Sequence, residues 1–310
     1  MADTAAIKDE LAHLKPRKKC DRLAELSALV RLTGSIHLKK GGLDLTMTSA
    51  NPAVARKTLL LIKDLFATDT KLASEAASSG RRKQNYVITM PAQPRLAFAL
   101  KQSGVLDADG TLTQGIMFSR FRDACCRAAY LRGAFLAAGS LSSGRHGYHL
   151  EIATANAILA EDILTLLEEC GFPAKLNERR KDFAVYLSDA ESILDFLALA
   201  GAHMSHLSLE NTRIFRSLRG EVNRVVNAEA ANLRKAVAAA VGQVADIRRI
   251  DETIGLAALP QALKELAALR LKHTDASTSE LGEMLVPPVS KIAVYHRFRR
   301  IRALAESRRN

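Results

Sequence analysis

The chain has 310 residues, of which 48% are hydrophobic and 25% are charged, and its formal net charge is +12 at pH 7. This composition is that of a globular protein and excludes a disordered chain. The absence of any run of about 18 apolar residues and of an apolar signal core predicts an intracellular protein without a membrane span. Four cysteines, two of them adjacent, make no disulfide framework. The positive charge favours nucleic acid as the partner, with an ordinary basic protein as the alternative.

A helix-like segment occurs twice in the sequence, 105 residues apart. Residues 26–35 return as residues 131–140, and the same offset pairs Cys20 with Cys125. A register that is kept over such a length indicates a duplicated structural unit. The two cysteines lie at the starts of equivalent predicted helices. We expect them to have a structural role there, in core packing or at the helix end. Reactive thiols with a pKa lowered by the helix dipole are the alternative.

The first copy reads as α-β-β-α-β-β-α. Gly41-Gly42 allows the positive φ of a tight hairpin turn, and Asn51-Pro52 combines a helix cap with a first-turn proline. Gly104 is the predicted end signal of the last helix. The predicted helices lie at about 21–33, 51–66 and 93–103, and the strands at 35–39, 43–48, 71–76 and 85–90.

The second copy follows the same order. Its offset falls to 97 in the second half, where Phe183 matches Tyr86, and a shorter loop accounts for the change. Gly133 and the alanines after it allow two helix backbones to approach closely, which predicts a pseudo-twofold pair. Beyond the repeated helix, the predicted elements are strands at 148–153, 174–177 and 183–187 and helices at 156–169 and up to 200.

Basic triplets lie in equivalent predicted hairpin turns of the two copies. Two symmetric clusters would neutralise phosphates of a duplex lying along both sheets, whereas two solvated turns are the alternative. The candidate phosphate contacts are Arg81, Arg82, Lys83, Arg179, Arg180 and Lys181.

Residues 207–256 are predicted to be a helical linker. An apolar stripe at helical spacing is expected to pack on a neighbouring domain or helix. The stripe consists of Val237, Val241, Val244, Ile247 and Ile250.

Residues 257–310 predict three short helices. The first spans 261–272, the second starts at the capping box Ser277-Thr278-Ser279-Glu280, and the third runs from Lys291 to about Glu306. Pro287-Pro288 separates the last two. The apolar stripe of the third helix comprises Val294, Phe298, Ile301 and Ala305.

A short helix, a turn and a basic helix are typical of a helix-turn-helix, whose second helix enters the major groove. We therefore predict a DNA-binding segment from about Ser277 to Arg309, with an Arg-rich solvated helix as the alternative. The predicted base contacts are Ser290, Lys291, Tyr295, His296 and Arg299, and the predicted phosphate contacts are Arg297, Arg300 and Arg302.

The paired helices that end in Gly-Ser, each followed by a hairpin, resemble the LAGLIDADG homing-endonuclease fold. In that family the eighth position of each motif is a carboxylate that holds a divalent metal. Here these positions are Thr33 and Ala138, which offer a hard cation no charged oxygen. The resemblance therefore implies a nuclease-derived scaffold without catalytic residues, metal or cofactor. His203 and His206 lie about one helical turn apart, but no clear third ligand accompanies them. Two surface histidines are therefore favoured over a zinc site.

The whole chain is similar to the WhiA family. The similarity rests on residues 125–136, on residues 148–152, on Asn223-Arg224-Val225-Val226-Asn227, on residues 287–291 and on His296-Arg297. It implies an α+β protein in which a double LAGLIDADG-like αββαββα domain precedes an all-α helix-turn-helix domain. We expect the first domain at 1–206, with repeats at about 20–106 and 125–203, then the linker and a helix-turn-helix domain at 257–310.

The resemblance also implies a function. We expect a bacterial DNA-binding transcription regulator, not an enzyme, that acts in cell division and chromosome segregation and, in sporulating relatives, in sporulation. Double-stranded DNA is the expected partner and the cytoplasmic nucleoid the expected location, with no membrane contact. RNA polymerase or a second regulator is an open further partner. The alternatives are an active homing-type endonuclease and a protein-interaction scaffold with incidental DNA contact.

Overall fold

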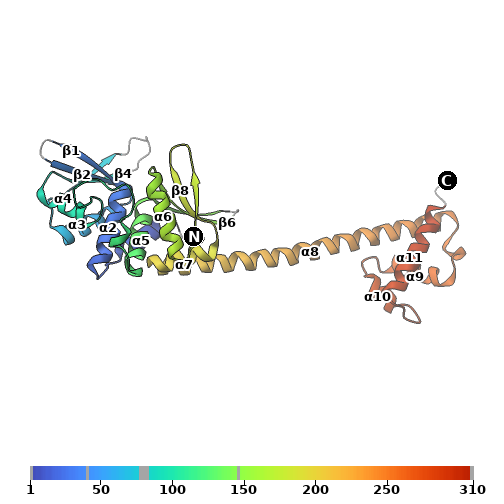
Figure 1. Ribbon diagram of the computed structural model, residues 1–310. Helices are drawn as coiled ribbons and strands as arrows, with labels where there is room; N and C mark the ends of the chain where they lie inside the picture. Colours follow the sequence, from blue (N-terminus) through green and yellow to red (C-terminus); the bar gives the residue numbers. More distant parts are fainter. Residues whose placement is uncertain (1–2, 40–41, 77–83, 145–146, 308–310) are drawn as a thin grey trace. The chain divides into compact units, whose positions relative to one another are not determined.

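The computed structural model of the chain describes residues 3–39, 42–76, 84–144 and 147–307 (Figure 1). Its contacts divide into two units, Met1–Ile214 and Phe215–Asn310. Within the described ranges, no helix has the length and apolar character needed to cross a membrane. The domain limits expected at residues 206 and 256 stay predictions. The two units are described separately.

The first unit contains two copies of the predicted α-β-β-α-β-β-α order, which confirms the duplication. Each copy forms a four-stranded antiparallel sheet, with strand orders β1-β2-β4-β3 and β5-β6-β8-β7. The elements of the first copy are α2 (Lys19–Thr33), β1 (Gly34–Lys39), β2 (Gly42–Ser49), α3 (Pro52–Phe66), β3 (Lys71–Ala76), β4 (Gln84–Met90) and α4 (Pro94–Gln102). Those of the second copy are α5 (Ala124–Ala138), β5 (Gly139–Gly144), β6 (Gly147–Thr154), α6 (Ala157–Glu169), β7 (Lys175–Glu178), β8 (Phe183–Leu187) and α7 (Ala190–Ala200).

The predicted local signals place these elements. The side chain of Asn51 accepts hydrogen bonds from the amides of Ala53 and Val54, at 2.8 and 3.0 Å. Asn156 caps α6 in the same way, through the amide of Leu159. Gly104 follows α4 with a φ of +72°, in the left-handed region that favours glycine. The shorter second copy arises partly in β7, which has four residues where β3 has six.

Both sheets turn one face to a shared core. In the first sheet Leu45 pairs with Met90, and in the second Leu150 pairs with Leu187. All four side chains are buried, whereas Thr48, beside the core residue Met47, is exposed. Met47 and Thr48 thus point to opposite faces of the sheet, as successive residues of a strand do.

The repeated helices α2 and α5 lie side by side between the two sheets (Figure 1). A Cβ atom placed on Gly133 of α5 would lie 2.5 Å from the carbonyl oxygen of Glu25 and 3.0 Å from the Cβ of Ala28, both on α2. The backbones thus approach as closely as the small residues predict. Both helices end at the predicted glycines, Gly34 and Gly139.

An N-terminal helix, α1 (Thr4–His13), was not predicted. It buries only Ile7 and Leu11, too short an apolar pattern to stand out in the sequence. Its Glu10 carboxylate accepts the amides of Met204 and Ser205, at 2.7 and 2.9 Å. These amides belong to the first turn of α8 (His203–Thr253), so α1 caps that helix.

The second unit has its own core, formed by the end of α8 with α9 (Gln261–Lys272), α10 (Thr278–Glu283) and α11 (Lys291–Glu306). The three short helices confirm the prediction. The apolar stripe of α8 is only partly as predicted, because Ile247 and Ile250 are buried, whereas Val237 and Val241 are 54% and 64% exposed. Only the C-terminal end of the stripe therefore packs into the core of this unit.

Candidate nucleic-acid interface

Hydrogen bonds fix both the start of α10 and the turn between α10 and α11, and the sequence predicts the first of these. The Ser277 hydroxyl accepts the Glu280 amide at 3.2 Å, and the Glu280 carboxylate accepts the Ser277 amide at 2.7 Å, which completes the capping box. Gly282 lies against the turn, because its carbonyl accepts the Val289 amide at 3.0 Å. A Cβ on Gly282 would lie 2.4 Å from the Val289 carbonyl oxygen, so only glycine fits there.

Arg270 of α9 is buried beneath this motif, which the sequence did not indicate. Its guanidinium donates to the carbonyl oxygens of Ala276, His273 and Thr274, at 2.6, 3.3 and 3.3 Å. It also lies 5.4 Å from the ring centroid of Phe298 in α11, a cation–π contact. Burial lowers the pKa of this guanidinium from its ordinary value. Arg270 of α9 therefore holds two further parts in place, namely α11 and the loop that precedes α10.

Helix α11 presents one buried and one exposed face. Ser290 caps it by accepting the Ala293 amide at 3.3 Å. The predicted apolar stripe, Val294, Phe298, Ile301 and Ala305, is buried as expected. Because successive residues of a helix are about 100° apart, the centre of the opposite face comprises Ile292, His296, Arg299, Arg300 and Ala303.

The predicted contact residues lie mostly on the exposed face. Tyr295 is 62% exposed on one edge of it, and Lys291 is exposed in the first turn. Arg297 is half-buried on the opposite edge, beside the apolar stripe. Arg302 pairs with Glu306, with 2.9 Å between Nε and Oε1. Arg308 and Arg309 lie outside the described residues.

Ile292 was not among the predicted contact residues. It is 69% exposed and lies one turn before His296, in the middle of the exposed face. An aliphatic side chain in that position is able to contact a thymine methyl group in the major groove. The sequence does contain a signal for it, because helical spacing places Ile292 opposite the apolar stripe that includes Val294 and Phe298.

The basic hairpin turn of the second copy forms between β7 and β8. The Arg179 amide donates to the Asp182 carbonyl oxygen at 2.8 Å, which closes the turn. The Arg179 guanidinium binds the Glu151 carboxylate at 2.6 Å, and His149 lies 3.2 Å from the same carboxylate oxygen. Arg180 and Lys181 are exposed. The matching triplet Arg81, Arg82 and Lys83 lies outside the described residues.

The C-terminal ends of α2 and α5 carry the side chains that the sequence predicts in place of the acids. The Thr33 hydroxyl donates to the Leu29 carbonyl oxygen of its own helix at 2.7 Å, and Ala138 carries only a methyl group. Across the described residues, the group of metal-ligating side chains that comes close together lies at the other end of the helix pair, at Cys20, Asp21, Cys125 and Cys126.

Two cysteines at the start of α5, Cys125 and Cys126, do not have the lowered pKa of reactive thiols. Hydrogen bonding to Asp21 and burial raise the pKa of Cys125, and burial raises that of Cys126. The alternative of a thiol pKa lowered by the helix dipole is therefore wrong for Cys125.

Profiles of three protein families match successive parts of the chain. The WhiA N-terminal LAGLIDADG-like domain matches residues 19–106, the WhiA LAGLIDADG-like domain residues 127–219, and the WhiA C-terminal HTH domain residues 222–305. These matches have the order that the sequence predicts.

Curated relatives match over almost their full length. The probable cell division protein WhiA of Heliobacterium modesticaldum is 42% identical over 99% of this chain and 97% of its own length. That of Desulforamulus reducens is 42% identical over 100% of this chain and 97% of its own length. The crystal structure of full-length DUF199/WhiA from Thermatoga maritima has a TM-score of 0.60 and 25% identity, and it covers 98% of this chain and 97% of that one.

Proposed function

Because this chain belongs to the WhiA family, we propose that it is a sequence-specific DNA-binding regulator of transcription that acts in cell division and chromosome segregation. Its relatives carry the name of probable cell division proteins, and it has the family's C-terminal helix-turn-helix domain. This class of module reads DNA in the major groove. Its site of action is then the nucleoid, in the cytoplasm, and RNA polymerase or a second regulator is a further partner to test.

The exposed face of α11 carries the proposal. Arg299 and Arg300 lie near its centre, have no ion-pair partner among the described residues, and flank His296 and Ile292. We assign Lys291, Tyr295, His296 and Arg299 to base edges and Arg300 to phosphate, with Ser290 at the start of the helix close to the groove. Arg297 and Arg302, at the two edges of this face, are assigned to phosphates.

Replacing Arg299 and Arg300 together by alanine is expected to weaken binding to a specific duplex by about 100-fold, since each lost base or phosphate contact costs about 1–3 kcal/mol. A mobility-shift titration at fixed salt measures the change. Arg234→Ala is the matched control, because it removes an exposed arginine from α8, outside α9–α11. Equal affinities of the double variant and the control would refute the assignment of α11.

The proposal includes the absence of nuclease activity. Thr33 and Ala138 support this absence, because neither supplies the carboxylate on which metal-dependent hydrolysis relies. Magnesium-dependent cleavage of DNA by the purified chain would favour the homing-type endonuclease instead. The protein-interaction scaffold would gain support if residues 1–206 of the intact protein gave no crosslink to a bound duplex.

The sheets of the first domain are proposed to contact phosphates through their basic turns. Because Arg179 is held by Glu151, Arg180 and Lys181 are the cations of this turn available to DNA. Replacing both by alanine is expected to reduce the slope of log affinity against log salt by about 1 to 2. Lys63→Ala, which removes an exposed charge from α3, is expected to leave the slope unchanged. An unchanged slope in the double variant would mean that these turns are merely solvated.

A further inference from the structure

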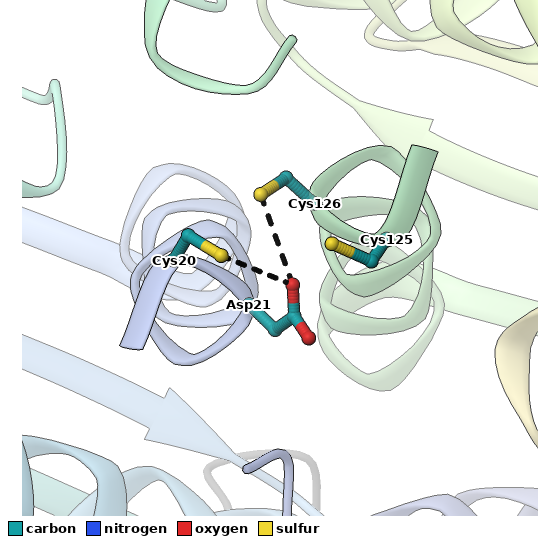
Figure 2. Close-up of side chains that lie close together, drawn as sticks. All are labelled: Cys20, Asp21, Cys125 and Cys126. Atoms are coloured by element: carbon teal, nitrogen blue, oxygen red, sulfur yellow. Dashed lines mark hydrogen bonds between the residues drawn. The ribbon is translucent and has the colours of Figure 1, made fainter. Parts of the chain in front are cut away.

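Four side chains with metal-binding atoms meet where α2 and α5 begin (Figure 2). Cys20 and Asp21 lie in the first turn of α2, and Cys125 and Cys126 lie in the first turn of α5. Their three sulfur atoms and one carboxylate oxygen all lie within 4.8 Å of one another. Cys126 is buried and the other three are half-buried. Four donors from two helices thus face a single point.

Asp21 occupies the centre of this group. Figure 2 shows its carboxylate reaching between the two helices, where one oxygen accepts hydrogen bonds from the thiols of both Cys20 and Cys126. The sulfur-to-oxygen distances are 3.5 and 3.7 Å. A carboxylate that bridges thiols of two helices shows that the donors already converge without an ion.

The duplication explains why these residues meet. The offset of 105 residues that relates α2 to α5 makes Cys20 equivalent to Cys125, and Asp21 equivalent to Cys126. Packing the two helices about a pseudo-twofold axis therefore brings the two dipeptides together. The sequence shows no zinc motif here, because such motifs have ligands at short spacings, whereas these two pairs are 105 residues apart.

We propose that Cys20, Asp21, Cys125 and Cys126 bind one zinc ion. Zinc favours four tetrahedral ligands, with thiolates at about 2.3 Å, which puts the sulfur atoms about 3.8 Å apart. The observed upper limit of 4.8 Å therefore requires a contraction of about 1 Å, within reach of side-chain rotation. With all four ligands supplied by the protein, the site is closed and structural, and it joins the two repeats. It lies at the opposite end of the helix pair from Thr33 and Ala138.

The surroundings supply part of the charge that such a site needs. Three thiolates and one carboxylate carry four negative charges, of which zinc cancels two. The positive N-terminal ends of α2 and α5 offset part of the remainder. Lys18 adds another cation, with its Nζ 3.7 Å from the Cys125 sulfur. Zinc binds thiolates, so binding to these cysteines is expected to release protons.

Metal content and cobalt titration test the proposal. The purified full chain is expected to contain one zinc per chain. After the metal has been removed under reducing conditions, added Co²⁺ is expected to give the thiolate charge-transfer and tetrahedral d–d bands, and zinc is expected to abolish them. Cys20→Ser combined with Cys126→Ser is expected to lose these bands. Cys170→Ser, which changes the one cysteine outside the cluster, is the matched control and is expected to keep them.

Asp21→Asn guards against a folding defect in the cysteine variants. It keeps all three thiols and is expected to weaken zinc binding by at least about tenfold. Replacing a residue that only hydrogen-bonds to a metal ligand already lowers metal affinity by that factor. The proposal is wrong if the reduced wild-type chain gives no cobalt bands, if Cys170→Ser loses them, or if the Asp21 variant binds zinc as tightly as the wild type. A Cys20–Cys126 disulfide in protein purified without reductant would also overturn it.

Discussion

A Glu25→Gln variant is expected to lose about 3–5 kcal/mol of unfolding free energy, because it leaves one buried and one half-buried cation without their counter-charge. Glu25 of α2 is fully buried. Its two carboxylate oxygens lie 2.9 Å from Lys57 Nζ of α3 and 3.1 Å from Arg132 Nη2 of α5. Lys57 is held further by the Leu14 carbonyl oxygen, at 2.5 Å. Burial lowers the pKa of Lys57, and the charge of Glu25 opposes that shift.

Urea unfolding followed by circular dichroism measures this loss, and hydrogen exchange assigns it to α2, α3 and α5. The matched control is Glu169→Gln, which breaks the exposed ion pair with Arg127 and is expected to cost about 1 kcal/mol or less. Similar losses in the two variants would show that the buried carboxylate is not what joins the two repeats.

Arg270→Met is expected to destabilise the second unit by about 2–4 kcal/mol, since it removes the cation–π contact and leaves partly buried carbonyl oxygens without this donor. DNA binding is expected to fall with it, although Arg270 is buried and does not reach the exposed face of α11. The loss would arise from the position of α11, not from a lost contact.

Hydrogen exchange across α9–α11 and a mobility-shift titration on the same preparation separate these causes. Lys272→Met is the control, because it removes an exposed cation from the same helix. If Arg270→Met weakened DNA binding while α9–α11 kept their protection from exchange, the proposed positioning role would be wrong.

Local sequence signals account for most of the fold. The Asn51 and Ser277 caps, the Gly104 end signal and the apolar stripe of α11 act over a few residues, so they can be read directly from the sequence. The pairing of α2 with α5 was predicted from the duplication and from Gly133 and the alanines after it, and the resemblance to a known fold supported it.

The unexpected features depend on contacts between distant segments. Arg270 lies on a helix whose apolar residues predict the core, and nothing in the sequence marks its guanidinium as buried. Cys20 and Cys126 become neighbours only when two repeats pack about their axis. Ile292 was not predicted as a contact, because the DNA contacts of α11 were predicted mainly from its polar and basic side chains.

The buried carboxylate of Glu25 also bears on the history of the chain. An ancestor with a single repeat would have paired two identical copies. The offset of 105 residues makes Ser27 equivalent to Arg132 and Glu25 equivalent to Tyr130. In a pair of present-day first repeats, each buried Glu25 would keep Lys57 but would meet Ser27 of the other copy in place of Arg132. The two halves are therefore complementary at this position and are not interchangeable.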